Sequence, residues 1–191
     1  MFRISKFMRE LIHPTPVGPR RDAPGPVVIW NLIRRCNLTC KHCYAISADT
    51  DFPGELSTDE VFHVLDDLKA FGVPALILSG GEPLLRPDIF DVSRRARDMG
   101  FYVGLSTNGT LIDDAMADRI AGVGYGYVGI SIDGIGATHD RFRRLDGAYE
   151  AAMGGVRRCR DRGLKVGLRF TMTQDNSGEL GDILDLLDAE D

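Results

Sequence analysis

The sequence predicts an α/β fold built on a parallel β-sheet. Five short apolar segments alternate with five helical patterns along the 191 residues. Continuous apolar strands indicate a sheet covered by helices, and the helix between successive strands implies right-handed crossovers. Five such units suit either an open doubly wound sheet or part of a barrel. In both arrangements the active residues gather at the C-terminal ends of the strands.

The first unit has the clearest boundaries. Residues 27–33, VVIWNLI, form the apolar run of a buried strand. A helix is expected over residues 57–72, where Ser57 and Glu60 form a capping box and Gly72 follows the last turn. The apolar positions of this helix recur three and four residues apart, which predicts one buried face. They are Val61, Val64, Leu65 and Leu68.

The same alternation continues to the end of the chain. The second helix has a proline near its start and a glycine after its end, as helices commonly do. Further strands are expected at residues 74–81, 101–109, 126–134 and 165–173. Further helices are expected at residues 87–100, 113–124, 147–163 and 177–191. The last helix is acidic, and its apolar face consists of Leu180, Ile183, Leu184 and Leu187.

One domain is expected after an N-terminal arm. Residues 1–26 combine a short amphipathic start with an extended stretch rich in proline and glycine, and residues 27–191 form the α/β core. The final helix has an apolar face to bury, but no sixth strand follows it. We therefore expect the chain to be the N-terminal part of a longer protein, truncated after about five βα units. The alternative is a natural terminus at which this helix closes the sheet.

Composition and charge restrict the class of protein. Hydrophobic residues make up 43% and charged residues 27% of the chain, as in soluble globular proteins. The net charge of -5 gives no indication of nucleic-acid binding. The first thirty residues lack a signal peptide, and no segment approaches the roughly 18 apolar residues of a membrane span. We expect a cytoplasmic protein with neither nucleic acid nor membrane as a partner, in which clustered thiols bind metal.

Three cysteines follow the first strand in the segment RRCNLTCKHCY. Cys36, Cys40 and Cys43 have the spacing C-x3-C-x2-C. A structural zinc site takes four ligands, usually from two separated pairs, and adjacent His42 is awkwardly placed to be the fourth. Three thiolates on an iron–sulfur cube would instead leave one iron open for chemistry. Zinc or unligated thiols remain the alternative. Cys159, alone in a helix, is expected to be an ordinary buried cysteine.

Small polar groups follow the next three strands. In LSGGEPLLRPD, Gly80 and Gly81 allow the backbone to approach a ligand closely, and Glu82 provides a carboxylate that can hold an amine. The segments STNG and SIDG end the third and fourth strands. Each is typical of a turn or helix cap when taken singly. Four successive strand ends with such groups indicate a ligand site at one edge of the sheet.

These motifs resemble those of the radical S-adenosylmethionine (SAM) superfamily over about residues 27–176. C-x3-C-x2-C followed by GGEP, about forty residues later, is a specific combination. The resemblance implies a partial (β/α)6 barrel and two cofactors, a [4Fe–4S] cluster and SAM. It implies that the cluster is bound by Cys36, Cys40 and Cys43, and that its fourth iron binds SAM. Cleavage of SAM would give a 5'-deoxyadenosyl radical, which abstracts a hydrogen atom from the substrate.

The resemblance also implies the residues that contact SAM. His42 takes the place of a usually aromatic residue beside the adenine. Gly80, Gly81 and Glu82 match the segment that holds the methionine amino group. The other matching positions, which face the ribose, the methionine end or its carboxylate, are Ser106, Asn108, Ser131 and Arg143. An arginine suits the bidentate binding of a carboxylate. The alternative interpretation is that Arg143 is an ordinary solvated surface residue. Asp133 is expected to shape its loop rather than to contact the ligand.

The N-terminal segments FMRELIHPTPVGPRR and GPVVIWNLIRRCNLTCKHCYAISAD are similar to the branch of this superfamily that acts in haem d1 biosynthesis. That branch removes propionate side chains from a sirohaem-derived tetrapyrrole. One alternative is the branch that converts propionates of iron-coproporphyrin to vinyl groups in the alternative haem pathway, and another is the peptide-modifying branch. A zinc-stabilised binding module is the alternative without catalysis.

A tetrapyrrole substrate carries several carboxylates, so its pocket should offer cationic side chains. Arg169, on the fifth strand, is a candidate to point inward, and Arg20 and Arg21 on the N-terminal arm are weaker candidates. For each of these arginines, the alternative interpretation is a surface charge without a role in binding. The reaction also needs an electron, for which we expect a flavodoxin- or ferredoxin-type donor as a partner.

Overall fold

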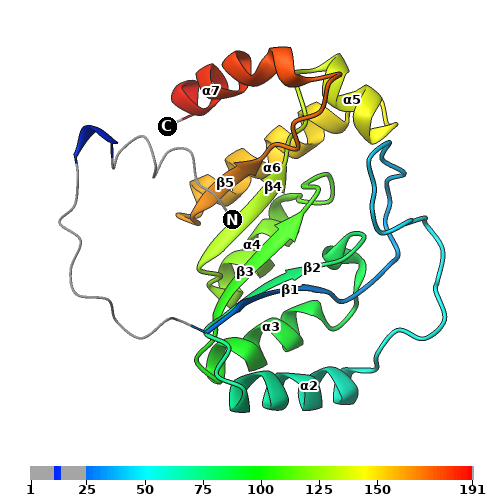
Figure 1. The fold of residues 1–191 in the computed structure, drawn as a ribbon, viewed down its shortest axis with the longest axis vertical. Coiled ribbons are helices and arrows are strands. Elements are labelled where there is room, and N and C mark those ends of the chain that lie inside the picture. Colours follow the sequence, from blue (N-terminus) through cyan, green and yellow to red (C-terminus); the bar gives the residue numbers. More distant parts are fainter. Residues whose placement is uncertain (1–10, 14–24, 191) are drawn as a thin grey trace.

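The structure is a computed structural model that describes residues 11–13 and 25–190 (Figure 1). Its five strands are all parallel and lie in the order β1-β2-β3-β4-β5. They are β1 (Val27–Asn31), β2 (Ala75–Ser79), β3 (Tyr102–Thr107), β4 (Tyr127–Ser131) and β5 (Val166–Arg169). Because every crossover leads to the adjacent strand in one direction, the sheet is a segment of a barrel. A doubly wound sheet would reverse its order.

Helices cover one face of this sheet. They are α2 (Thr58–Ala70), α3 (Ile89–Asp98), α4 (Asp114–Val123), α6 (Ala148–Asp161) and α7 (Leu180–Ala189), with a shorter α5 (Ala137–Arg143) beyond the end of β4. Strand residues that face the helices are fully buried: Leu76, Leu78, Leu105, Val128 and Ile130. Their neighbours along the strands point the other way, and there Val27 is 61% and Ile29 is 55% exposed. We call this second side the open face of the sheet.

Helix α2 shows the local signals that the sequence predicts. The Ser57 hydroxyl accepts the Glu60 N–H at 3.3 Å, and the Glu60 carboxylate accepts the Ser57 N–H at 2.8 Å. The capping box is therefore confirmed. Val61 and Leu65 are fully buried, while Val64 and Leu68 are half-buried.

The structure differs from the sequence-based expectations at the element ends. The strands end up to four residues earlier than expected, because the polar segments after them form loops instead of sheet. Helix α5 was not predicted, since its segment ATHDRFR is short and polar. A 3-10 turn, η1 (Pro83–Leu85), follows Gly80, Gly81 and Glu82. On α7, only Ile183 of the expected apolar face is buried, and Leu184 and Leu187 are exposed.

The arm expected over residues 1–26 lies almost entirely outside the described residues, and so do Arg20 and Arg21. Among the helices of the described part, none is long and apolar enough to cross a bilayer.

Candidate functional site

The loop after β1 carries the three cysteines along the edge at which the strands end. We call residues 36–43 the cysteine loop. In Figure 1 the chain leaves β1 along this edge and passes close to α5. The Lys41 N–H donates to the Phe142 carbonyl at 2.9 Å, which joins the cysteine loop to α5. Within the loop, the Cys43 N–H donates to the Cys40 carbonyl at 3.3 Å.

The two glycines after β2 pack directly on the chain that leads into the cysteine loop. The Gly81 N–H donates to the Ile33 carbonyl at 2.6 Å, and the Glu82 N–H donates to the Arg35 carbonyl at 2.9 Å. A Cβ atom on Gly81 would lie 2.4 Å from the carbonyl oxygens of Arg34 and Arg35. A Cβ atom on Gly80 would lie equally close to the Ile33 carbonyl oxygen, 2.4 Å away. Any larger residue at either position would therefore displace residues 33–35, which lead into the cysteine loop.

Glu82 is fully buried between β2 and β3. One carboxylate oxygen accepts the Thr107 hydroxyl at 2.8 Å and the Leu84 N–H at 3.1 Å, and the other accepts the Asn108 N–H at 2.8 Å. Burial raises the pKa of Glu82 to about 7, against the opposing effect of these hydrogen bonds and of the Arg143 charge. Glu82 thus ties the turn after β2 to the end of β3, and its contact with the SAM amino group stays a prediction.

Asn108 faces the first cysteine. Its side-chain amide donates to the Asn37 side-chain oxygen at 2.9 Å and lies 3.9 Å from the Cys36 sulfur. The Leu38 N–H also donates to this sulfur, at 3.4 Å. Asn37 in turn donates to the Thr110 hydroxyl at 2.9 Å. Neither Asn37 nor Thr110 was predicted as a site residue, although Asn37 lies within the cysteine motif and Thr110 directly follows STNG.

Arg143 faces the second cysteine and is 8% exposed. Its guanidinium donates to the Cys40 sulfur at 3.5 Å and forms an ion pair with Asp133 at 2.5 Å. The same Asp133 oxygen lies 3.2 Å from the His42 Nε2, and the His42 ring packs edge-on against Phe142. The predicted SAM contacts His42 and Arg143 are therefore brought together, on a carboxylate that is itself fully buried.

Asp133 also holds its own loop. One carboxylate oxygen accepts the Thr171 N–H at 3.1 Å, and its backbone N–H donates to the His139 Nδ1 at 3.0 Å. Burial, together with the Arg143 charge, lowers the pKa of His139 to about 4, so this imidazole is neutral at pH 7. Neither the ion pair of Asp133 nor the role of His139 was predicted, since no spacing in the sequence joins them to the cysteines.

The three thiols have different surroundings. Burial raises the pKa of Cys36 to about 11. For Cys43, burial is outweighed by hydrogen bonding with the Ser47 hydroxyl and with backbone groups of residues 45–47, which lowers its pKa. Among the described residues, no three His, Cys, Asp or Glu side chains are grouped so that they could hold a metal ion.

Ser106 and Ser131 lie at the same edge of the sheet. The Ser106 hydroxyl accepts a hydrogen bond from the Arg169 guanidinium, which reaches it from β5. Ser131 pairs in register with Arg169. All predicted site residues therefore come from the C-terminal ends of β1 to β4 and from the helix after β4.

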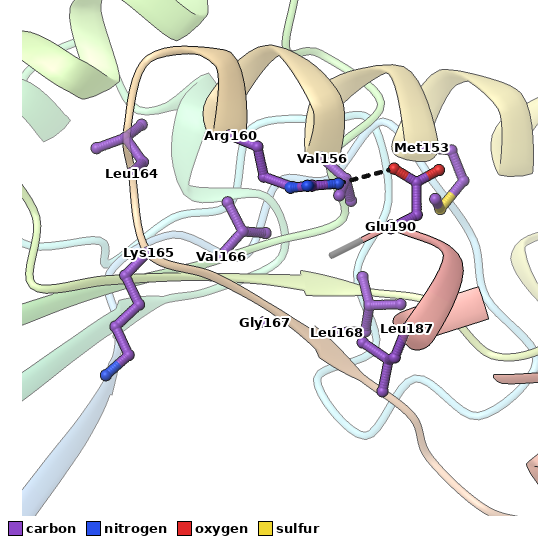
Figure 2. A pocket seen from close by; sticks show the side chains of 10 residues that line it. All are labelled: Met153, Val156, Arg160, Leu164, Lys165, Val166, Gly167, Leu168, Leu187 and Glu190. Carbon is purple, nitrogen blue, oxygen red and sulfur yellow. Dashed lines mark hydrogen bonds and ion pairs between the residues drawn. The ribbon is translucent and has the colours of Figure 1, made fainter. Parts of the chain in front are cut away.

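A separate pocket lies between α6, β5 and α7 (Figure 2). Val156, Leu168 and Leu187 form its apolar wall, and Arg160 donates to Glu190 at 3.0 Å across it. This pocket contains none of the predicted site residues. Cys159, on α6, is fully buried as expected, and burial raises its pKa to about 11.

Comparisons with known proteins agree with this geometry. Residues 30–187 match the family described as the Radical SAM superfamily. The chain is 58% identical to the Pre-heme d1 synthase of Dinoroseobacter shibae, over 100% of this chain and 47% of the relative. It is 49% identical to the Fe-coproporphyrin III synthase of Methanosarcina barkeri, over 86% of this chain and 41% of the relative. The chain thus spans about half the length of the curated relatives that it matches.

The fold is also similar to solved structures. Streptococcus suis SuiB bound to S-adenosylmethionine matches 86% of this chain and 38% of its own, with a TM-score of 0.72 and 17% sequence identity. This likeness confirms the partial barrel that the sequence predicts.

Proposed function

The chain belongs to the radical SAM superfamily, and we propose that it forms the cofactor-binding core of an enzyme of haem d1 biosynthesis. In this proposal the enzyme removes propionate side chains from a sirohaem-derived tetrapyrrole. The observation that carries it is the identity of 58% over the whole chain to a Pre-heme d1 synthase, in a chain whose three cysteines lie at the C-terminal edge of the sheet.

The donor set at this edge has the chemistry that a [4Fe–4S] cluster needs, and the three thiols would have to draw together when they bind it. Cys36, Cys40 and Cys43 supply three thiols from one loop, and the buried Cys159 belongs to the helical layer. N–H groups of Leu38 and Arg143 already point at two of the sulfurs. Such donors favour the thiolate form, which is the form that binds iron. When bound, the cluster and SAM together supply a 5'-deoxyadenosyl radical that takes a hydrogen atom from a propionate side chain.

We assign the SAM contacts to residues around the cysteine loop. Gly80 and Gly81 place backbone groups against residues 33–35, which lead into Cys36. Ser106, Asn108 and Ser131 provide hydroxyl and amide groups at the ends of β3 and β4. Arg143 is held by Asp133 next to Cys40, so a carboxylate of SAM would approach a guanidinium that is already oriented. His42, fixed against Phe142, is the side chain proposed to lie by the adenine.

A second candidate is the conversion of iron-coproporphyrin propionates to vinyl groups. The observation that favours it is identity of 39% to the AdoMet-dependent heme synthase of Nitratidesulfovibrio vulgaris, over 91% of this chain. Both candidates begin with hydrogen abstraction from a propionate, so they share the site described above. For both we expect a flavodoxin- or ferredoxin-type protein as the electron donor.

Iron and sulfide analysis with EPR spectroscopy under anaerobic conditions tests the cofactor assignment. We expect a cubane signal in the reduced protein that shifts when SAM is added. Serine at any of the three clustered cysteines should abolish that signal, whereas Cys159→Ser, the matched control, should keep it. Zinc without iron, or a signal indifferent to SAM, would contradict the proposal.

The substrate assignment needs a second experiment. The reduced protein is incubated with SAM and either a sirohaem-derived tetrapyrrole or iron-coproporphyrin III, and the products are identified by mass spectrometry. Loss of whole propionate groups from the first compound is expected. Vinyl groups formed only from the second compound would favour the alternative haem pathway instead.

A further inference from the structure

The open face of the sheet presents apolar side chains in one register row. Ile29, Ile77 and Tyr127 supply these side chains, and Gly104 completes the row between Ile77 and Tyr127 in the register from β1 to β4. Ile29 is 55% exposed, and Ile77 and Tyr127 are half-buried. Groups of exposed apolar side chains rimmed by polar residues are typical of binding surfaces. This row therefore offers an apolar floor beneath the edge that carries the cysteine loop.

Glycines on β4 and β5 leave space on this face for neighbouring side chains. A Cβ atom on Gly129 would lie 2.8 Å from the Arg169 Nε and 2.9 Å from the Tyr127 ring, and one on Gly167 would lie 2.6 Å from the Tyr127 hydroxyl oxygen. The Tyr127 ring therefore lies over both glycines, and the Arg169 side chain lies over Gly129. The Arg169 guanidinium continues to β3, where it donates to the Ser106 hydroxyl.

We propose that Arg169 binds a carboxylate of the substrate, whose ring system lies on the open face against Ile29, Ile77 and Tyr127. This inference depends on the proposed tetrapyrrole substrate. A flat macrocycle matches a floor on which the aromatic ring and the guanidinium lie along the sheet. A guanidinium held in place by Ser106 is oriented before the ligand arrives, and its planar fork matches a carboxylate.

The position of Arg169 also fits the chemistry. Arg169 pairs with Ser131 at the C-terminal end of its strand, at the edge that carries the cysteine loop. A carboxylate bound there would bring a propionate arm to the side of the sheet at which SAM is proposed to bind. Arg169 is therefore a specificity-determining residue that selects an acidic macrocycle over a neutral one.

The test compares a sirohaem-derived tetrapyrrole with its full methyl ester, which keeps the ring and loses the carboxylate charges. Binding is titrated anaerobically from the Soret absorbance of each compound with the cluster-loaded protein. We expect the wild type to prefer the acid, and Arg169→Met to bind the acid about tenfold to a hundredfold more weakly while binding the ester as before. Arg94→Met, on the exposed surface of α3, is the matched control and should keep the wild-type preference.

The outcomes distinguish an error in the proposed substrate from an error in the role of Arg169. If the wild type binds neither compound, the tetrapyrrole substrate is wrong and this inference fails with it. If the wild type prefers the acid and Arg169→Met keeps that preference, only the role of Arg169 is wrong. Loss of the SAM-dependent EPR shift in Arg169→Met would place Arg169 in the SAM site and would also overturn the inference. Should Arg169→Met fail to fold, Arg169→Lys is titrated instead, and an undiminished preference for the acid would count against the guanidinium fork.

Discussion

Glu82 gives the sharpest prediction, because a fully buried carboxyl at the centre of the site titrates near neutral pH. Its pKa is raised from 4.5 to about 7 by burial. Between these values the folded chain keeps a proton that the unfolded chain has released. The free energy of unfolding therefore falls as the pH rises through this window. The difference in pKa corresponds to about 3 kcal/mol from this one residue.

Glu82→Gln isolates this effect, since glutamine has nearly the same shape and does not titrate. Its amide group would face the Thr107 hydroxyl or the Asn108 N–H, so a pH-independent cost of about 1–3 kcal/mol is expected in addition. Urea unfolding of the iron-free wild type and variant at several pH values between 4.5 and 7.5 measures the pH-dependent loss of stability and the pH-independent cost of the substitution. The stability of the wild type relative to the variant should fall by about 3 kcal/mol across this range. A constant difference would refute the pKa and the argument from burial.

Three further perturbations test the contacts around the cysteine loop and the start of α2. Asp133→Ala leaves the Arg143 guanidinium buried without its partner and should lower the free energy of unfolding by about 3–5 kcal/mol. In urea unfolding, the double variant with Arg143→Met should lose less stability than the sum of the two single losses. Strict additivity would show that the pair does not interact. Gly81→Ala should reduce the iron bound on anaerobic reconstitution, because its Cβ would lie 2.4 Å from two carbonyl oxygens. Gly122→Ala, where nothing lies within 4 Å, should bind as much iron as the wild type, and equal iron in both variants would contradict the argument. Ser57→Ala should cost about 1 kcal/mol in thermal unfolding, and an unchanged midpoint would mean that the capping box adds no stability.

The pattern of strands and helices was sufficient to predict the parallel sheet, but only the family resemblance distinguished a barrel segment from a doubly wound sheet. Barrel segments and doubly wound sheets use the same local pattern of apolar strands and amphipathic helices. They differ in the face to which each helix returns, and that depends on the packing of the whole domain. Helix α5 escaped prediction for another reason. Its seven residues include only one large apolar side chain, Phe142, and too few turns for a periodic signal.

The sequence was sufficient to predict which residues gather at the edge of the sheet, but not which of their side chains contact each other. Strand-end motifs placed Cys36, Glu82 and Asn108 at one edge, because the ends of parallel strands meet there. Which polar atoms face each other depends on side-chain directions in loops, and no periodicity governs those. The ion pair of Asp133 with Arg143 is an example, since each residue alone has an ordinary turn or surface interpretation in the sequence.

The contacts of the cysteine loop also set an order of events during synthesis. The ribosome releases Cys36, Cys40 and Cys43 early, but the groups that hold their loop belong to later units. Gly81 and Asn108 come from the second and third units, and Arg143 from the helix after the fourth strand. A nascent chain therefore exposes three thiols for as long as it takes to translate about a hundred further residues. Iron that arrived during this interval would meet a loop without its partners, so productive loading of the cluster belongs after the folding of the fourth unit.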